Sequence, residues 1–593
     1  MKTFYQQKFY LKIAVLAIIL TSLFGFSKHF SRIYSNSDPA VAGFDAFGYY
    51  MYLPHLVQKG HLNISQDWLE EVQEKRYGFS AYQLAQRENG NRVNIYHMGL
   101  SYVQAPAFFV GHGTAYIFGY KTDGLSKPYV YAMLLNALLF LYLGLFYLYK
   151  FLCLFFNSTI AITLVLLSFF ATNLLATSYV SFMMQHVYLF SLISVFCYHF
   201  FKAFQSETID KKHFYISVVV FGLCTVVRPT HVLLYFIPVL YLWNYFDSRK
   251  SYFINLLLFP ISSFIWNIPQ FLYWKIIGGS WLLTNLHTEE IILVDPYIFE
   301  FLFSYRKGWF LYTPLFLLLF PAFYFTFKES KRIFWSVLVT LIVCIWVFSS
   351  WECWHYAASF GSRVMIDLYP ICLLIIGFLF KRVLELKFNY RFTFFGIIVL
   401  ISVLNCFQSY QIFEGVLSDT SMTKSYYWKV FGKTHKVPNT EPYLIIDRND
   451  LNWPEKYTNH QFVDLRLKNT QLLNLNLTNQ ITDSKIASIC LLDKLKTDES
   501  QLIVTYNFIV KDSNVSFLGK CEVESKFNTY NWNSLELTLG KPKNKLLQER
   551  LIFNLPEIRH KKDSLMVYIS SVSPEIIEMK SIQINAISLI RKD

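Results

Sequence analysis

The chain has 593 residues, of which 54% are hydrophobic, 19% aromatic and only 16% charged. Soluble domains carry about 25% charged residues, so this composition excludes a string of soluble domains and favours a chain that lies mostly in lipid. The 54 Lys and Arg exceed the 40 Asp and Glu, which gives a net charge of +14. These basic residues form small groups between apolar runs rather than one stripe, which excludes nucleic acid as a partner and is typical of multi-spanning membrane proteins.

The first apolar run, Ile13 to Phe26, follows three lysines and could be a cleaved signal peptide. No A-x-A type site follows it, so we interpret it as an uncleaved first span with a cytoplasmic N-terminus. Further runs long enough to cross about 30 Å of hydrocarbon begin near Pro128, Ile160, Met183, Phe214, Val232, Phe253, Trp309, Ile333, Val364 and Phe392. The sequence therefore predicts a polytopic α-helical membrane domain of about eleven spans over residues 1–410.

Basic residues in alternate loops set the predicted orientation, because short cytoplasmic loops hold the excess of Lys and Arg. These loops contain Lys202, Lys211 and Lys212; Arg249 and Lys250; Lys328, Lys331 and Arg332; and Lys381, Arg382, Lys387 and Arg391. An odd number of spans places the segment 31–127 and everything after Ser409 outside the cytoplasm. The predicted location is a bacterial inner-membrane type of multi-pass protein with an extracytoplasmic, periplasmic C-terminal domain.

The stretch from Met98 to Tyr120 is apolar but contains three glycines and Pro106, which make a poor spanning helix. Counting it as a span would invert every later loop against the charge rule. We expect a helix at the membrane surface or a partly re-entrant one within the long first outer loop, 31–127.

After Ser409 the hydrophobic runs shorten and alternate with polar residues. Val463, Leu465 and Leu467 alternate with charged residues, and Leu535, Leu537 and Leu539 repeat the pattern. Period two indicates strands, and about nine such segments predict an extracytoplasmic β-sandwich over residues 441–593 after a linker at 411–440. Its two cysteines, Cys490 and Cys521, could pair in an oxidising compartment, although the sequence does not give their separation.

Asp45 lies among aromatic residues directly after the first span, with Asp38 seven positions before it. Apolar surroundings raise the pKa of a carboxylate and its basicity, which suits a general base. Asp45 could equally cap the helix that begins there. The neighbouring Tyr49 and Tyr50 are candidate pocket residues.

A second polar segment, 349–370, contains Glu352, His355, Arg363 and Asp367 between two spans. An arginine after a small-residue turn suits a phosphate oxygen, because guanidinium offers two parallel donors. The alternative is an Arg363–Asp367 helical pair at i, i+4, and the two roles are compatible.

Two further outer segments carry candidate side chains. Arg306 and Lys307 precede a span on the side where basic residues are otherwise scarce, which suggests an anionic ligand or contact with lipid head groups. The remaining substrate-pocket candidates are Glu289, Glu290, His186, Arg228 and His97. His186 and the nearby His231 could be only hydrogen-bonding residues. No cysteine or histidine cluster predicts a metal or cofactor, and the scattered carboxylates leave a divalent metal open.

Several of these segments together resemble the GT-C superfamily of membrane glycosyltransferases, nearest to the protein O-mannosyltransferase and aminoarabinose transferase type. The resemblance runs through residues 10–410 in order: Asp45, Tyr96–Leu100 with Ala105–Pro106, Gln185–His186, Val227–Thr230, Arg306–Pro314 and Ser359–Arg363. Two departures are His186, where many relatives have a second acidic residue, and Tyr96–His97, where a Lys-Pro or Tyr-Pro pair is common. These departures concern the identity of donor and acceptor.

The resemblance implies a glycosyltransferase that takes a sugar from a polyprenyl phosphate and passes it, with inversion, to a protein, lipid or glycan acceptor. Asp45 would be the catalytic carboxylate, as general base or as the group that orients the acceptor. Arg363, Arg306, Lys307 and His355 would bind the donor phosphate. A transporter or flippase of lipid-linked sugars is the alternative, although we find no repeated halves. A scaffold protein that works through its β-domain would leave Asp45 and Arg363 without a role.

Overall fold

The computed structural model describes residues 15–591 in two compact units, Met1–Thr420 and Ser421–Asp593. Their boundary falls within the predicted linker 411–440. Left out of the description are residues 1–14, 23–24, 26, 28–30, 32–35, 37–38, 244, 246–247, 284–285, 287–290, 459–464, 477–483, 491–494, 496, 498, 512–516, 525–528, 538–543, 556–562, 572–576 and 592–593. Three predicted site residues, Asp38, Glu289 and Glu290, lie outside the described residues.

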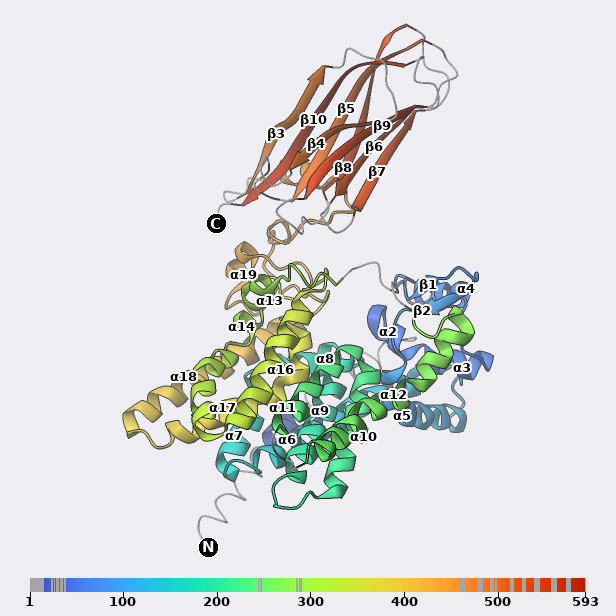
Figure 1. Ribbon diagram of the computed structural model, residues 1–593. Coiled ribbons are helices and arrows are strands. Elements are labelled where there is room, and N and C mark those ends of the chain that lie inside the picture. Colours follow the sequence, from blue (N-terminus) through green and yellow to red (C-terminus); the bar gives the residue numbers. More distant parts are fainter. Residues whose placement is uncertain are drawn as a thin grey trace. The chain divides into compact units, whose positions relative to one another are not determined.

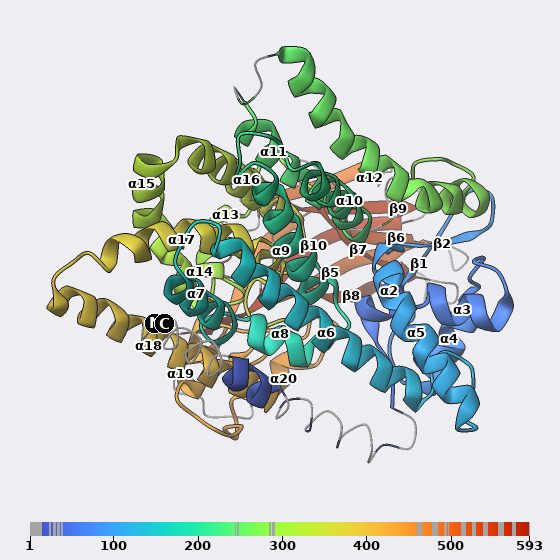
Figure 2. The same cartoon turned by 90° about the horizontal axis from the view of Figure 1, so that it is seen from below.

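The first unit is helical (Figures 1 and 2). Five of its described helical stretches are long and apolar enough to cross a membrane: α6 (Lys127–Leu152), α12 (Arg249–Gly278), α16 (Lys331–Ser349), η4 with α17 (Arg363–Leu368 and Tyr369–Val383) and α18 (Phe388–Phe413). A sixth is the pair α7 (Ser158–Phe170) and α8 (Leu174–Val180), bent by 49°. Helices α9 (Gln185–Ala203) and α10 (Lys211–Val227) follow the predicted runs near Met183 and Phe214.

Two of the remaining predicted runs are divided into shorter helices. The run from Val232 lies in the 3-10 helix η2 (Pro229–Tyr235) and the short α11 (Phe236–Tyr241). The run from Trp309 divides into α14 (Trp309–Tyr312), η3 (Pro314–Leu318) and α15 (Leu319–Glu329). Pro314, at the start of η3, lacks the N–H that would continue α14. The total of eleven spans stays a prediction.

The helices differ in how far they face outward. Helix α17 is almost entirely buried, whereas α12 and α18 lie at opposite sides of the helical unit in both views. Apolar side chains stand exposed along these two, such as Phe264 on α12 and Leu400 on α18. Lipid is the solvent that accepts such a surface, because a comparable apolar patch in water would drive association.

The segment 31–127 packs around a second apolar core, to which Tyr273 and Trp274 of α12 also contribute. Its elements are α2 (Phe44–Tyr50), α3 (Tyr52–Lys59), α4 (Gln66–Glu70), the π-helix η1 (Glu71–Arg76), the antiparallel pair β1 (Leu84–Gln86) and β2 (Arg92–Asn94), and α5 (Gly99–Ile117). Helix α5 is not among the membrane-crossing candidates and exposes apolar side chains near its end, among them Val110, Tyr116 and Ile117. Such a surface fits the expected interfacial helix.

The second unit begins with α19 (Lys424–Val430), η5 (Glu441–Tyr443) and α20 (Trp453–Thr458). The described strands are β3 (Leu465–Asn476), β4 (Ser484–Cys490), β5 (Ser500–Val510), β6 (Phe517–Glu524), β7 (Thr529–Leu537), β8 (Leu546–Asn554), β9 (Ser564–Ser571) and β10 (Ile577–Arg591). They form two antiparallel sheets in the orders β3-β10-β5-β8 and β4-β9-β6-β7. Val504 and Ile584 of one sheet share a core with Val523 and Val567 of the other, as in a sandwich. The period-two pattern correctly predicted these strands.

Cys490 and Cys521 lie on strands that do not neighbour each other. Cys490 of β4 pairs with Ser564 of β9, and Cys521 of β6 pairs with Val567 on the other side of β9. Two strand spacings amount to about 9.5 Å, which exceeds the roughly 7 Å limit between the Cα atoms of a disulfide. The backbone register therefore excludes a disulfide between them in this fold.

Candidate active site

Asp45 lies in the first turn of α2, which starts after the first apolar run. The N-cap position belongs to Gly43, and no side chain caps this helix. The capping alternative for Asp45 is therefore wrong, because its carboxylate is used elsewhere. Phe44 has a φ of 52°, a left-handed backbone that few L-residues adopt. This turn directs the start of α2 toward residues from distant parts of the chain.

Three side chains hold the Asp45 carboxylate. Arg363 donates from Nη2 to Oδ2 over 3.0 Å, while the hydroxyls of Tyr82 and Tyr96 donate to Oδ1 over 2.5 and 2.7 Å. Tyr96 approaches closely because α2 has a glycine beneath its ring, since a Cβ at Gly48 would lie 2.0 Å from the ring. Residues separated by up to 318 positions thus meet at one carboxylate.

The pKa of Asp45 is shifted in the direction opposite to the one expected from the sequence. Burial opposes ionisation, but the Arg363 guanidinium and the two tyrosine hydroxyls outweigh it and lower the pKa of Asp45 below its ordinary value. Burial and the adjacent carboxylate raise the pKa of Tyr82 and of Tyr96, so both phenols stay protonated as donors. The predicted increase in basicity is wrong, because aromatic neighbours that donate hydrogen bonds stabilise the charged form. Asp45 is an ionised hydrogen-bond acceptor at neutral pH.

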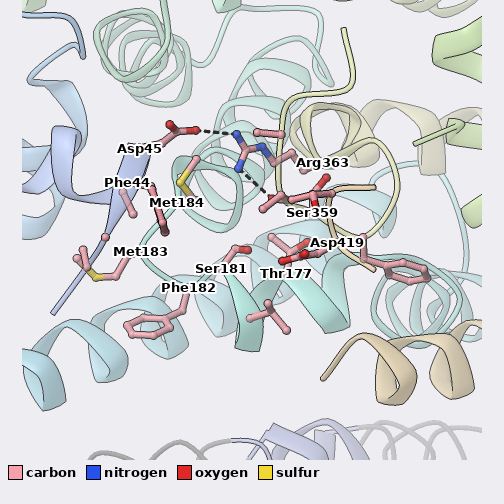
Figure 3. A pocket seen from close by; sticks show the side chains of 18 of the residues that line it. Phe44, Asp45, Thr177, Ser181, Phe182, Met183, Met184, Ser359, Arg363 and Asp419 are labelled. Carbon is pink, nitrogen blue, oxygen red and sulfur yellow. Dashed lines mark hydrogen bonds and ion pairs between the residues drawn. The ribbon is translucent and has the colours of Figure 1, made fainter. Parts of the chain in front are cut away.

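Asp45 and Arg363 line a cavity of about 560 Å³. Figure 3 shows the two side chains joined at one wall, with Phe182, Met183 and Met184 near Asp45 and with Ser359 and Asp419 near Arg363. Much of the lining is apolar and comes from α2, α8 and the loops around them. One ionised pair in a largely apolar pocket of this volume is typical of a site for an amphipathic organic ligand.

The loop before η4 places Arg363. Gly361 has a φ of 60°, and a Cβ there would lie 2.8 Å from the Cβ of Tyr312, so glycine is required for the close approach. Arg363 Nη1 also donates to the carbonyl of Ala358 over 3.3 Å. The Nε–H of Arg363 has no hydrogen-bond partner among the described residues. Arg363 is thus the first residue of the 3-10 helix η4, after a turn of small residues as the sequence indicates.

Lys307 is buried, with 2% of its surface exposed, and donates from Nζ to the carbonyl oxygens of Ser359 and Asp419. Burial outweighs the nearby Asp419 and lowers the pKa of Lys307 to about 7. The lysine therefore connects the loop of Arg363 to the loop after α18. Arg306, the preceding residue, is half-buried, and its backbone N–H donates a hydrogen bond to the hydroxyl of Ser304. Neither cation lines the cavity, unlike Arg363.

A second acidic centre surrounds Asp367, one turn after Arg363. Asp367 is fully buried and is contacted by His186 at 2.9 Å, His231 at 3.2 Å and Arg228 at 3.3 Å. The Arg228 guanidinium also lies over the rings of Phe348 and Tyr356. The expected Arg363–Asp367 pair is thus replaced by two separate ion pairs, and His186, Arg228 and His231 serve the second.

The remaining predicted site residues lie elsewhere. Tyr49 packs against Tyr96 with ring centroids 4.8 Å apart, and Tyr50 donates to the carbonyl of Gly124 in the outer-segment core. His97 packs on Trp274, and His355 accepts the N–H of Ala357. His97, His355 and Glu352 do not line the cavity.

The sequence did not single out Tyr82 as a site residue, and Tyr96 stood out only as part of the segment Tyr96–Leu100. Their hydroxyls reach Asp45 from 37 and 51 positions away, which no local spacing reveals. No group of three or more His, Cys, Asp or Glu side chains in the described part of the chain is placed to hold a metal ion.

The chain thus combines a helical unit with candidate membrane-crossing helices, a sandwich unit, and a carboxylate–guanidinium pair at the wall of a cavity. No protein family model and no curated protein matches the chain. The crystal structure of the Archaeoglobus fulgidus oligosaccharyltransferase in the apo form is similar, with a TM-score of 0.42 and 10% identity over 74% of this chain and 59% of that chain. The archaeal oligosaccharyltransferase AglB from Archaeoglobus fulgidus, in complex with an inhibitory peptide and a dolichol-phosphate, gives 0.41 and 11% over 77% and 59%. This chain thus spans about 59% of the length of each.

Proposed function

We propose that this protein is an integral membrane glycosyltransferase that moves a sugar from a polyprenyl phosphate to an extracytoplasmic acceptor. The acceptor is a protein, lipid or glycan. The observation that carries the proposal is the Asp45–Arg363 pair, whose atoms lie 3.0 Å apart at the wall of a cavity of about 560 Å³. A carboxylate that orients the acceptor and a cation that binds the phosphate are the two groups that this transfer needs, and the apolar walls suit a lipid-linked donor.

Arg363 is the residue we assign to the donor phosphate. Its side chain is 8% exposed, and a cation so buried is costly unless partnered. Its guanidinium is part of the cavity wall, where a phosphate oxygen would accept hydrogen bonds from it. When the bond between the anomeric carbon and the phosphate oxygen breaks, the polyprenyl phosphate leaves with the electron pair. Arg363 would stabilise the negative charge that develops there. Lys307 would hold the loop of Arg363 rather than touch the phosphate.

Asp45 is the residue we assign to the acceptor. Its lowered pKa makes it a weak base, which favours the orienting role over early proton removal. The acceptor hydroxyl would donate a hydrogen bond to the carboxylate while its oxygen attacks the anomeric carbon from the face opposite the phosphate. A new carbon–oxygen bond then forms with inversion, and the hydroxyl proton passes to Asp45 once that bond is well formed. The reaction needs no nucleotide or redox partner.

The test uses the purified full-length protein in proteoliposomes with polyprenyl-phosphate-linked sugars and candidate acceptors. Asp45→Asn should insert into the membrane but, per amount of folded protein, lose transfer about 100-fold or more, the loss expected when one electrostatic contact to the reacting groups is removed. Glu71→Gln is a matched control, because Glu71 pairs with the exposed Lys75 on η1 and does not line the site cavity. Wild-type rates in Asp45→Asn would contradict the assignment. Movement of intact lipid-linked sugar across the bilayer without bond cleavage would instead identify a transporter.

The proposed orientation has its own test. Reporter fusions at Asn439 and Asp593 should be active only as exported reporters. A cytoplasmic signal at either position would contradict an outer sandwich unit.

A further inference from the structure

A lysine-rich segment opens the second unit. Between Ser421 and Thr440 the sequence has four lysines, at positions 424, 429, 433 and 436, and neither aspartate nor glutamate. Helix α19 forms the first part of this segment and ends at Val430. A run with one sign of charge attracts a surface of the opposite sign, so this segment favours an anionic partner.

Helix α19 and the residue after it present two aromatic rings to the outside. Trp428 is 56% exposed and Phe431 is 42% exposed. Their ring centroids lie 5.2 Å apart, so the two rings form one patch. The buried face of the helix consists of Tyr426, Tyr427 and Val430. Exposed aromatic rings beside lysines are typical of a segment at the boundary between hydrocarbon and lipid head groups.

Contacts at both ends of α19 hold this patch in place. The hydroxyl of Thr423 accepts the N–H of Tyr426 over 3.1 Å and donates to the carbonyl of Tyr443 over 2.5 Å. The ammonium group of Lys429 lies 4.1 Å from the centroid of the Tyr443 ring. The two aromatic rings are therefore displayed by a helix whose position is fixed. The other lysines of the segment are exposed, namely Lys424, Lys433 and Lys436.

The chain keeps this segment close to the end of a candidate membrane helix. Helix α18 ends at Phe413, and the chain turns at Gly415, whose φ is 65°. Asp419 follows, in the loop whose carbonyl accepts a hydrogen bond from Lys307. Lys424 comes five residues later, and five residues span at most about 18 Å. The start of α19 therefore stays near the level at which α18 leaves the hydrocarbon.

A protein partner fits this surface less well than a lipid surface does. Interfaces between proteins bury about 800 Å² on each side and are depleted of lysine. Anionic head groups instead accept lysine ammonium groups, while the boundary below them accepts the aromatic rings. We propose that residues 424–436 dock on anionic phospholipids where α18 ends, with Trp428 and Phe431 at the hydrocarbon boundary.

The test identifies what lies against position 428. The photoreactive residue benzoylphenylalanine replaces Trp428 in the full-length protein, which is reconstituted in vesicles of equimolar phosphatidylcholine and phosphatidylglycerol. Irradiation should attach phospholipid at position 428, and mass spectrometry of the digested protein detects the adduct.

The control places the same photoreactive residue at position 546, where attachment of lipid should be much weaker. Leu546 is 64% exposed at the start of β8. Asn554, at the other end of this strand, donates to the carbonyls of Arg448 and Asp450 in the segment that leads into the sandwich. Position 546 therefore combines high exposure with the strand end that lies away from that segment.

The role of charge is measured with the same lipid adduct. Lys433→Glu together with Lys436→Glu should lower its yield by at least about fivefold, the factor that one lysine contributes near an anionic surface. Lys511→Glu together with Lys545→Glu changes the net charge equally at two exposed positions of the second unit, and should leave the yield unchanged. Vesicles of phosphatidylcholine alone should lower the yield in the protein with all its lysines, which provides the same test if the first pair does not fold.

Two results would overturn the docking surface. One is attachment of position 428 to peptides of this chain, or of a second copy of it, in place of lipid. The other is an equal yield of lipid adduct with and without phosphatidylglycerol. Neither measurement involves sugar transfer, so both outcomes are separate from the test of the proposed function.

Discussion

Two carboxylate–arginine pairs lie one helical turn apart in the helical unit, and they differ in access. Asp45 keeps 27% of its side chain exposed and faces the cavity with Arg363. Asp367 has no exposed surface and is contacted by His186 and His231 as well as Arg228. Arg363 follows a turn of small residues, and Arg228 precedes Pro229. The two arginines therefore look alike in the sequence.

Whether a ligand can reach an ion pair decides whether that pair can take part in the reaction. A ligand can exchange with the groups that hold Asp45, since the cavity reaches both members of the pair. Asp367 does not line that cavity and has no exposed surface, and a buried pair of this kind fixes the arrangement of α9, η2 and η4 instead. We therefore expect changes at the first pair to reduce transfer, and changes at the second to reduce the free energy of unfolding.

The largest effect on catalysis should come from Arg363. Arg363→Ala should reduce transfer by about 2–4 kcal/mol in the activation free energy, whereas Arg363→Lys keeps the charge, loses the planar donors and should lose less. The measurement is transfer rate against donor concentration, normalised to folded protein. Unchanged donor dependence in Arg363→Ala would end the phosphate assignment.

The largest effect on stability should come from Asp367. Asp367→Asn leaves Arg228 as an uncompensated buried cation and should cost about 3–5 kcal/mol of unfolding free energy. The double variant Asp367→Asn with Arg228→Gln removes both charges and should recover much of that loss. Denaturant unfolding of the purified proteins measures both. A double variant no more stable than the single one would show that the pair is not the cause.

Tyr96→Phe should have a smaller effect on the Asp45 pair. Loss of a hydrogen bond to a charged group costs about 1.5–3 kcal/mol, and here the loss raises the pKa of Asp45. Because that pKa is lowered in the folded protein, activity is present at neutral pH and falls as pH drops through it. The acid limb of the transfer rate should therefore move to higher pH in Tyr96→Phe. Tyr82→Phe should shift it in the same direction, and an unmoved limb in both variants would contradict the hydrogen-bonded assignment.

The last expected effect is a pH dependence of stability at Lys307, which does not line the cavity. Its folded pKa is about 7, against 10.5 for an ordinary lysine, so the unfolded chain holds more protons between these values. The unfolding free energy should rise with pH across that window, by at most about 1.4 kcal/mol per unit. Lys307→Met should lack this contribution. Melting temperatures of the two proteins between about pH 7 and pH 9 would reveal the difference, and parallel curves would contradict it.

The helices and strands followed from the sequence because they depend on local patterns. Apolar runs predicted the positions of α6, α12, α16, α17 and α18, and period-two alternation predicted strands such as β3 and β7. The number of spans stays a prediction, because hydropathy does not register a division such as the one between α14 and η3 at Pro314. Such breaks depend on the missing proline N–H and on what packs around it.

The site was only partly predictable for a different reason. Asp45 and Arg363 stood out because each is a charge beside an apolar run, and they lie together in the structure. The sequence did not predict that Asp45 and Arg363 form an ion pair with each other, because they are 318 positions apart. The same limit produced the error in the pKa of Asp45: aromatic residues were counted as apolar surroundings, whereas Tyr82 and Tyr96 present hydroxyls to it.

The loop that leads to Arg363 departs from ordinary backbone geometry. Tyr356 and Ala357, neither of them glycine, have φ values of 53° and 51°, and Gly361 follows at 60°. Left-handed backbone costs a non-glycine residue on the order of 1 kcal/mol. Evolution could relieve part of that cost by placing glycine at the exposed position 357, at no loss of packing. Alanine at this position keeps the loop stiff but leaves the backbone strain in place. A substitution here that raises the heat tolerance of the protein would therefore make the placement of Arg363 less precise.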